Sequence, residues 1–368
     1  MNKLLLIFFL LYSKGSNAQV HSKESIKDVA YLKAIGFAEK YLDSLQKVQG
    51  IPGLSVCIGS SKKLFWGEGF GYADLENLVP VSIYSKFRMG SVSKSITSVA
   101  VGRLVQEKLL DPDTPIQLYV PVGKSAKGDI TARQLATHTA GIRHYRENDP
   151  LSIPKRYKTV QESLGIFISD SLLFIPGSSF NYSTYGYSLL SAVIEGASHI
   201  DYLSYMQQKV FLPLGMTQTG ADFSDSVVVN RVRFYERGSL GLVNAAQVDN
   251  SYKWAGGGLL STPIDLVKLS MGLFNYTILR PETVALLFTP QILPDQKNTY
   301  YGFGWRVGVG SRGKKIIHHG GLIDGGRTFL LLYPDDEIAI AITANMSGAR
   351  INIPEAETIA NFFFDIKP

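Results

Sequence analysis

The amino-acid sequence predicts an α+β fold in which an antiparallel sheet is built from both chain ends and a helical region is inserted between the strands. Two strand-like runs lie near the N-terminus, helical patterns dominate the middle, and strand-like runs return near the C-terminus. The 368 residues are 45% hydrophobic and contain neither repeats nor low-complexity linkers, which favours one compact unit with a large core. An active site is expected between the sheet and the helical region.

The expected elements follow the apolar periodicity in chain order. A helix is expected at residues 25–49, and two strands at 53–59 and 64–72 with a polar turn between them. The middle helices are expected at 91–108, 131–138, 185–197, 202–210 and 263–273. The late elements are strands at 303–309, 314–318, 328–333 and 338–344, a hairpin turn at 334–336 and a closing helix at 354–364.

The N-terminus has the pattern of a secretory signal peptide. Lys3 precedes an apolar run at residues 4–12, and small residues follow up to Ala18, where we expect cleavage. The apolar run is shorter than the roughly 20 residues that span a bilayer. We therefore expect a signal peptide at 1–18 and one mature domain at 19–368, which is exported to the periplasm or the extracellular space without a stable membrane span.

Charge and cysteine content exclude several classes of function. The formal net charge of +6 falls by two when Lys3 and Lys14 leave with the signal peptide, and the basic residues are scattered, so no nucleic-acid partner is predicted. Cys57 is the only cysteine, which excludes an internal disulfide framework and a cysteine-built metal site. It lies in a strand-like run and is expected to be a buried small hydrophobe. No cofactor is predicted.

One serine stands out as a candidate nucleophile. The spacing Ser-x-x-Lys occurs five times, beginning at Ser44, Ser60, Ser91, Ser152 and Ser311. Only Ser91 leads into a helix of small and apolar residues, with Lys94 one turn later on the same face. Burial and the positive end of the helix both disfavour an ammonium ion, so Lys94 is expected to accept the serine proton. The N–H groups at the helix start suit a developing oxyanion.

A second interpretation of this segment is purely structural. Serine is a common helix cap, and the long side chain of a lysine often reaches solvent. Ser91 and Lys94 alone therefore leave the catalytic and the structural interpretation about equal.

Four segments, in order along the chain, resemble those of a known family. They are Gly-Ser-Val-Ser-Lys at 90–94, Thr-His-Thr-Ala-Gly at 137–141, Asn-Tyr-Ser-Thr at 181–184 and His-His-Gly-Gly at 318–321. Over roughly residues 51–364 the chain resembles the serine β-lactamase-like and penicillin-binding family, which includes class C enzymes, D-alanyl-D-alanine peptidases and related esterases. The resemblance is strongest to its LACTB-like branch. It implies a β-lactamase/transpeptidase-like fold and a β-lactamase-related serine hydrolase domain.

The resemblance assigns roles to residues of this sequence. It implies that Ser91 forms an acyl-enzyme, that Lys94 is its partner base and that Tyr182 relays a proton to the leaving group. We expect Lys94 to lower the pKa of Tyr182. Without the motif, Tyr182 would be one of nineteen tyrosines, most of which must be packing residues. The resemblance also implies an oxyanion hole made by the backbone N–H groups of Ser91 and Gly321.

The remaining candidates would bind substrate. Neighbouring residues of a strand face opposite sides, and we expect His318, rather than His319, to face the cleft. Gly320 and Thr184 are further candidate substrate-binding residues, and His138 is expected to be a structural support. Histidine replaces the usual lysine at 318 and threonine the usual asparagine at 184, which favours small peptide or ester acyl donors over β-lactams. A histidine pair without nearby carboxylates or cysteine predicts no metal site.

Other enzyme motifs are missing from the sequence. There is no Gly-x-Ser-x-Gly nucleophile elbow, no complete P-loop and no His-Glu-x-x-His zinc motif. The serious alternative is a non-catalytic family member that binds peptidoglycan fragments or assembles with itself. A pure binder has no chemical need for Ser91, Lys94 and Tyr182 together, which argues against it. The sequence leaves open the bond that is cleaved and the oligomeric state.

Overall fold

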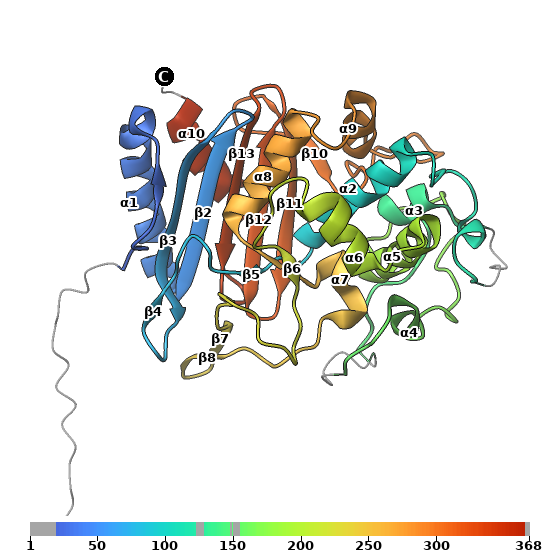
Figure 1. Ribbon diagram of the computed structural model, residues 1–368, viewed down its shortest axis with the longest axis horizontal. Helices are drawn as coiled ribbons and strands as arrows, with labels where there is room; N and C mark the ends of the chain where they lie inside the picture. Colours follow the sequence, from blue (N-terminus) through green and yellow to red (C-terminus); the bar gives the residue numbers. More distant parts are fainter. Residues whose placement is uncertain (1–19, 123–128, 148, 150–154, 365–368) are drawn as a thin grey trace, which may run out of the picture.

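The computed structural model describes residues 20–122, 129–147, 149 and 155–364. A large sheet lies beside a mainly helical region, as Figure 1 shows. The predicted signal peptide at 1–18 lies outside the described residues. Within the described part of the chain, every helix is too short or too polar to cross a membrane.

The large sheet combines strands from both ends of the chain. Its order is β1-β3-β2-β13-β12-β11-β10, with β4 paired to β3, and all of its neighbouring pairs are antiparallel. Its strands are β1 (Ile26–Lys27), β2 (Gly53–Ser60), β3 (Leu64–Asp74), β4 (Val79–Pro80), β10 (Arg306–Val309), β11 (Lys315–Ile323), β12 (Gly326–Tyr333) and β13 (Ile338–Ala344). Because β2 pairs with β13, the sequence-based prediction of the fold is confirmed.

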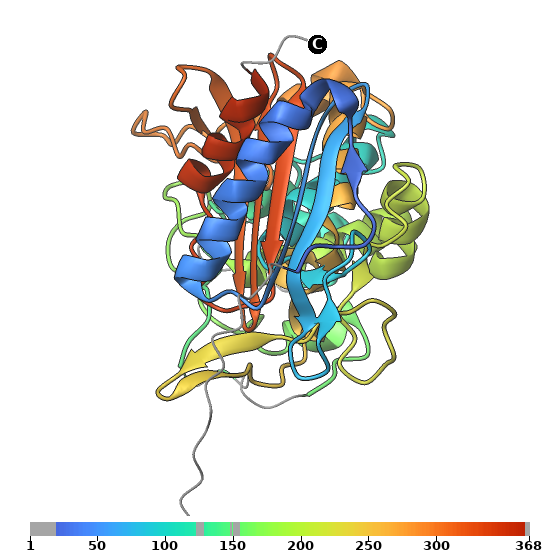
Figure 2. The same cartoon turned by 90° about the vertical axis from the view of Figure 1, so that its left-hand side faces the viewer.

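Helices cover both faces of this sheet. On one face α1 (Leu32–Gln49) and α10 (Ile353–Phe364) lie side by side, drawn in blue and red in Figure 2. On the other face α8 (Pro263–Phe274) packs against β2 and β13, and the helical region continues beyond it. Residues of β2 are consequently buried on both sides, and Cys57 is among them, as predicted. Burial raises the pKa of the Cys57 thiol, so this cysteine is a packing residue.

The helical region surrounds α2 (Val92–Gln106). Every residue of α2 from Val92 to Gly102 is buried, as expected for a helix that is apolar or small on all sides. Its neighbours include α5 (Thr184–Ser198), α6 (Tyr202–Met206), α7 (Trp254–Gly257) and α9 (Pro281–Phe288). The other helices of the region are α3 (Ala132–Ala136), α4 (Val160–Leu164) and the π-helical turn Gln207–Phe211, with 3-10 turns at Ile116–Leu118 and Ser251–Lys253. The start of α2 therefore has a rigid, fully packed base.

The structure also departs from the predicted elements. The predicted first helix begins late, at Leu32, because residues 26–27 pair with β3 and a 3-10 turn, Val29–Tyr31, follows. β11 continues past the predicted end at 318 and reaches Ile323. Short strands outside the large sheet were not predicted: β5 (Phe87–Arg88), β6 (Gly220–Ala221) and β9 (Leu259–Ser261) form one small sheet, and β7 (Tyr235–Gly238) and β8 (Gly241–Asn244) form a hairpin.

Candidate active site

Ser91 lies in a tight turn between β5 and α2. Gly90, just before it, has a φ of +49°, and a Cβ there would lie only 2.9 Å from the backbone nitrogen of Leu322. Ser91 occupies the N-cap position of α2, but its side chain forms no capping hydrogen bond. The alternative in which Ser91 is only a helix cap is therefore wrong, and its partly exposed hydroxyl is left for other contacts.

Lys94 is completely buried one turn into α2. Its Nζ lies 2.6 Å from the Gly256 carbonyl oxygen, 3.1 Å from Thr184 Oγ1 and 3.3 Å from Ser91 Oγ. Among the residues described by the structure, no carboxylate pairs with it, so the alternative in which Lys94 reaches solvent is wrong as well. Burial holds the pKa of Lys94 well below its usual value, and the positive charges of Lys253 and Arg306 lower this pKa further.

These contacts suit a neutral amine. A neutral amine has two N–H donors and one lone pair. The Gly256 carbonyl and the Thr184 hydroxyl accept the two N–H groups, which leaves the lone pair for the Ser91 hydroxyl. The geometry of Lys94 is thus that of a base for Ser91.

Tyr182 completes the group around Ser91. Its phenol hydrogen-bonds Ser91, and its ring centroid lies 4.8 Å from Lys94 Nζ. Burial raises the pKa of Tyr182 to about 12, although the hydrogen bond with Ser91 and the charge of Arg306 oppose this increase. The expectation that Lys94 lowers this pKa is wrong, because Lys94 is not among the groups that lower it and burial outweighs those that do. A neutral phenol is chemically a proton donor.

A cluster of rings fixes the position of Tyr182. The ring centroid of His138 lies 4.2 Å from that of Tyr182, and those of Tyr301 and His319 lie 6.2 and 6.3 Å away. The Nδ1 atom of His138 accepts a hydrogen bond of 3.1 Å from the Ser183 N–H, which fixes the ring. Burial lowers the pKa of His138 well below its usual value, so the ring is neutral. His138 therefore supports Tyr182, consistent with the structural role expected from the sequence.

The two histidines of β11 face opposite sides of the sheet, and the choice of His318 for the cleft is wrong. His318 stacks on Phe329 at 5.6 Å, on the face covered by α1 and α10, and the Cα of Gly320 faces the same ring. His319 faces the side of Tyr182 instead, with ring centroids 6.3 Å apart: its Nε2 accepts from the Tyr301 hydroxyl at 2.9 Å, and its Nδ1 donates to the Gly320 carbonyl at 2.8 Å. The sequence correctly predicted that the two histidines face opposite sides, but not which of them faces the cleft.

The burial of both histidines determines their charge. Burial, assisted by Arg306, lowers the pKa of His318 to about 4. Burial and the nearby Lys94 lower the pKa of His319 well below its usual value. Both rings are therefore neutral at pH 7. Neither histidine supplies the cation that a lysine would supply at this strand.

The register of β11 also moves the predicted oxyanion donor by one residue. The two-residue turn after Ile323 makes Ile323 and Gly326 a hydrogen-bonded pair of β11 and β12. Hydrogen-bonded pairs alternate along antiparallel strands, so Gly321 is also hydrogen-bonded to β12. The N–H of Leu322 points to the opposite edge, past the end of β10 and toward the turn at Gly90. Leu322, rather than Gly321, is thus the candidate second donor beside the N–H of Ser91. Gly321 serves close packing, because a Cβ there would lie 1.9 Å from the Met89 oxygen.

A small cavity of about 90 Å³ opens beside Ser91. It is lined by Gly90, Ser91, His144, Tyr145, Thr184, Lys253, Gly256, Gly257, Leu322 and Ile323. Thr184 lies here as predicted, and its N–H donates to His144 Nδ1 at 3.2 Å. Lys253, His144 and Tyr145 were missed by sequence analysis, because they come from loops without a motif that assigns them a role.

Comparison with known proteins agrees with this architecture. The family model described as Beta-lactamase matches residues 38–360. The chain belongs to the beta-lactamase family. Its relatives include the serine beta-lactamase-like protein LACTB, mitochondrial, of Homo sapiens, which is 31% identical over 88% of this chain and 78% of the relative. Protein flp of Staphylococcus aureus (strain MRSA252) is 25% identical over 82% of this chain and 61% of the relative.

Solved structures share the fold of this beta-lactamase-family chain. The octameric penicillin-binding protein homologue from Pyrococcus abyssi has a TM-score of 0.78 at 24% identity, over 90% of this chain and 77% of that one. The D-amino acid amidase from Ochrobactrum anthropi SV3, complexed with D-phenylalanine, has a TM-score of 0.77 at 21% identity, over 91% of this chain and all of that one. Family and fold are thus established together.

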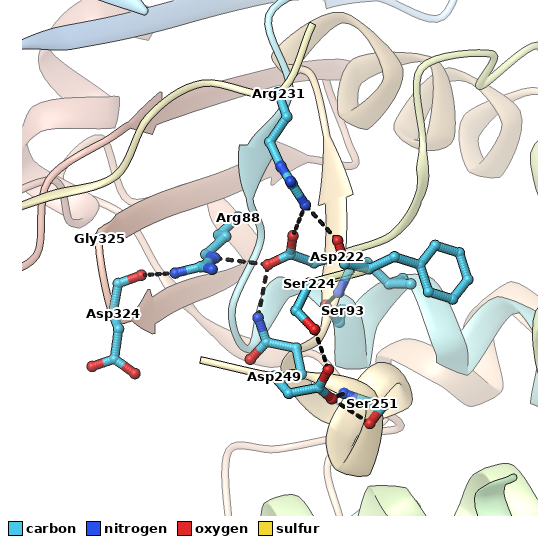
Figure 3. Close-up of polar contacts among 12 residues, drawn as sticks. Arg88, Ser93, Asp222, Ser224, Arg231, Asp249, Ser251, Asp324 and Gly325 are labelled. Carbon is cyan, nitrogen blue, oxygen red and sulfur yellow. Dashed lines mark hydrogen bonds and ion pairs between the residues drawn. The ribbon is translucent and has the colours of Figure 1, made fainter. Parts of the chain in front are cut away.

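A buried carboxylate connects the segments that build the site of this beta-lactamase-family protein. Asp222 accepts hydrogen bonds from Arg88 Nε at 2.7 Å, Asn250 Nδ2 at 2.8 Å and Arg231 Nη1 at 3.3 Å. Arg88 also donates to the backbone oxygen of Asp324 at 2.8 Å, as Figure 3 shows. One network therefore holds three segments: the one before Ser91, the one before α7 and the one after β11.

The site contains no evident metal ligands. Within the described ranges, no three His, Cys, Asp or Glu side chains are grouped so that they could hold a metal ion.

Proposed function

We propose that this protein is a serine hydrolase that forms an acyl-enzyme on Ser91 and acts on peptide or ester acyl donors. The observation that carries the proposal is the buried Lys94, whose Nζ lies 3.3 Å from Ser91 Oγ without a carboxylate partner in the described part of the chain. Maintaining a buried amine is costly for a protein, and a base for the neighbouring hydroxyl gives it a function.

In the first half of the reaction, Ser91 Oγ attacks the acyl carbonyl carbon. Lys94 accepts the hydroxyl proton as the new C–O bond forms, and the N–H groups of Ser91 and Leu322 stabilise the oxyanion. The bond from the acyl carbon to the leaving group then breaks. Tyr182 donates its proton to the departing nitrogen or oxygen, and Lys94 then returns the proton that it accepted from Ser91 to the phenolate, since both groups border Ser91.

In the second half, water replaces the leaving group. It loses a proton to the same Lys94 and Tyr182 pair while its oxygen bonds to the acyl carbon. The bond to Ser91 Oγ then breaks, and the proton returns to Ser91 as the carboxylic acid leaves. Because each half requires one proton donor and one acceptor, a neutral amine beside a neutral phenol suits both.

The substrate class follows from the chemistry of the cleft. His319, which lies on the Tyr182 side of β11, is neutral, and His318 on the other side is neutral as well, so this strand offers no fixed cation for the β-lactam carboxylate. Backbone groups of Gly320 and the Thr184 hydroxyl remain candidates for substrate contact. The D-amino acid amidase among the structural neighbours supports amides as acyl donors. We therefore favour peptide and ester substrates over β-lactams.

A fluorophosphonate probe tests the nucleophile. We expect intact-mass spectrometry to detect one adduct on the wild-type protein and none on Ser91→Ala. Ser44→Ala is the matched control, because Ser44 also begins a Ser-x-x-Lys spacing but lies exposed on α1. Full labelling of Ser91→Ala, or loss of labelling in Ser44→Ala, contradicts the assignment. If the wild type stays unlabelled and hydrolyses none of a panel of esters, D-peptides, L-peptides and nitrocefin, the alternative of a non-catalytic peptidoglycan-binding or self-assembling protein is favoured.

Export to the periplasm or the extracellular space is part of the same proposal. It depends on the signal-peptide pattern at residues 1–18, whereas the human relative is named as mitochondrial. N-terminal sequencing of the protein from its native cells tests it. A mature N-terminus just after Ala18 is expected, and an intact N-terminus at Met1 contradicts it.

A further inference from the structure

Lys253 is a buried cation without an anionic partner. The residue is 8% exposed, and within the described part of the chain its Nζ forms neither an ion pair nor a hydrogen bond to a side chain. The ring centroids of Tyr252 and Tyr145 lie 5.0 and 5.8 Å from this nitrogen. Burial lowers the pKa of Lys253 to about 8, with Asp324 opposing the decrease, so the side chain is mostly protonated at pH 7.

The side chain of Lys253 runs toward the nucleophile. A Cβ on Gly257 would lie 3.7 Å from Lys253 Cδ and also 3.7 Å from the backbone carbon of Gly90, so the lysine stem passes close to the turn that carries Ser91. Lys253 lines the 90 Å³ cavity together with Ser91 and Leu322. The cation therefore belongs to the wall of the cavity.

The segment that presents Lys253 is held rigidly. Asp249 accepts hydrogen bonds from the hydroxyls of Ser224 and Ser251, as Figure 3 shows. The Ser251 hydroxyl in turn accepts from the N–H of Tyr157 at 2.8 Å. Since Asn250 is bound to Asp222 as well, the 3-10 turn that ends at Lys253 is fixed from two sides.

The described residues that line the cavity are rich in donors and include no acidic side chain. None of the ten residues that line it is an aspartate or a glutamate. His144 accepts the Thr184 N–H at Nδ1, and burial lowers its pKa to about 4, so its other ring nitrogen carries the only proton. The nearby carboxylate of Asp222 is already occupied by two arginines and an asparagine. An anionic group would therefore find a cation and N–H donors here. The carboxylate with the largest effect on Lys253 is that of Asp324, which is exposed and lies outside the cavity lining.

The position of Tyr182 indicates which part of a substrate the cavity receives. Tyr182 is the proton donor for the leaving group and does not line the cavity; its ring lies instead beside His319 and Arg306. The leaving group thus lies on the Tyr182 side of Ser91. The cavity on the other side, next to the Leu322 N–H, receives the acyl group, and its small volume limits that group to a short chain.

We propose that the cavity beside Ser91 binds a short acyl group that carries a carboxylate, and that Lys253 is the specificity-determining residue that binds this carboxylate. The inference rests on the proposed acyl transfer to Ser91 and extends it to the class of acyl group. The carboxylate supplies the partner that buried Lys253 lacks, and a charge-assisted hydrogen bond in a nearly dry cavity is stronger than one in water. A role confined to lowering the pKa of Lys94 would affect all acyl groups equally.

A matched pair of substrates tests the inference. Succinyl p-nitroanilide carries the carboxylate, and succinamoyl p-nitroanilide replaces it with an amide of nearly the same shape. We expect the wild type to favour the succinyl substrate by at least about tenfold in kcat/KM, the typical value of one charged hydrogen bond. Lys253→Met should lower kcat/KM for the succinyl substrate about tenfold more than for the amide. Lys62→Met, which removes a lysine from an exposed turn, should keep the wild-type ratio.

Two outcomes overturn the inference. One is a wild-type ratio near one, which needs no variant and therefore no assumption about folding. The other is an equal loss for both substrates in Lys253→Met while fluorophosphonate still labels Ser91. If Ser91 is not labelled at all, the proposed function fails separately. Calorimetry of succinate with Ser91→Ala and with Ser91→Ala/Lys253→Met then still decides: at least tenfold tighter binding by the single variant supports the carboxylate site, and equal or absent binding refutes it.

Discussion

Replacing Lys94 with methionine separates a catalytic from a structural lysine. Methionine fills the same space without the amine, so the Gly256 carbonyl and the Thr184 hydroxyl each lose one donor. Two such hydrogen bonds contribute about 1 kcal/mol each. Burial of the amine already costs stability, and each unit by which its pKa is lowered corresponds to about 1.4 kcal/mol. The two effects offset each other, and the free energy of unfolding at pH 7 should change by less than about 2 kcal/mol.

The effect on rate should be far larger. Loss of a general base costs about 10²–10⁴ in kcat, which corresponds to about 2.7–5.4 kcal/mol of activation free energy. The assay is ester hydrolysis at saturating substrate together with urea unfolding of the same samples, with Lys33→Met on the exposed side of α1 as control. Activity within tenfold of the wild type, or a loss of stability above about 3 kcal/mol, would refute the assignment of Lys94 as the base.

The difference in stability between the wild type and Lys94→Met should depend on pH. The folded-state pKa of Lys94 lies below its unfolded value of 10.5, so between these two values the unfolded chain binds the extra proton and the lysine destabilises the fold. This cost disappears as pH rises toward 10.5, and Lys94→Met should therefore lose stability relative to the wild type as the buffer becomes alkaline. The cations that act on Lys94 are Lys253 and Arg306, and the rings of Tyr182 and Tyr187 lie 4.8 and 5.5 Å from its Nζ. His138 and His319 also interact with Lys94, and both rings are neutral. Wild-type kcat/KM should rise with pH as Lys94 loses its proton.

Three further predictions concern the surroundings of the base. Tyr182→Phe should lower kcat about 10²–10⁴-fold, and combining it with Lys94→Met should cost far less than the product of the two; losses that multiply in the double variant would contradict a shared proton path. Asp222→Asn should lower the free energy of unfolding by about 3–5 kcal/mol, because two arginines lose a buried anion, and an unchanged urea midpoint would contradict the role of the network. Gly321→Ala should abolish activity, since its Cβ would meet a backbone oxygen at 1.9 Å, whereas the Cβ of Gly320→Ala meets a ring at 3.3 Å and should be tolerated; kcat/KM values in the opposite order would show that the register of β11 is misassigned.

The fold could be predicted because its signals are local and repeated. Apolar alternation marked β2, β3, β12 and β13, and the continuous small and apolar pattern marked the buried α2. The start of the first helix was misjudged because a two-residue strand is formed by pairing with β3 rather than by its own sequence. The same holds for β5, β6 and β9, which are too short to leave a pattern.

In the candidate site, too, residues within motifs could be predicted, and residues whose position depends on the folded chain could not. Ser91, Lys94, Tyr182 and Thr184, which the motifs selected, lie together in the structure, and their roles in a reaction stay predictions. It misassigned His318 and Gly321, since the phase of a strand depends on where its hairpin closes, and adjacent identical residues conceal that phase. Lys253 carries no motif of its own, and only the burial of its charge in the folded chain reveals it.

The central claim is that Ser91 carries the acyl group, and trapping the intermediate tests it most directly. Wild-type protein mixed with an activated ester should be quenched in acid within its first turnovers, digested and mapped by mass spectrometry. We expect the acyl mass on the peptide containing Ser91, and more of it in Tyr182→Phe when proton transfer to and from water limits deacylation. Acyl mass on another residue, or turnover of the ester by Ser91→Ala at the wild-type rate, would show that Ser91 is not the nucleophile.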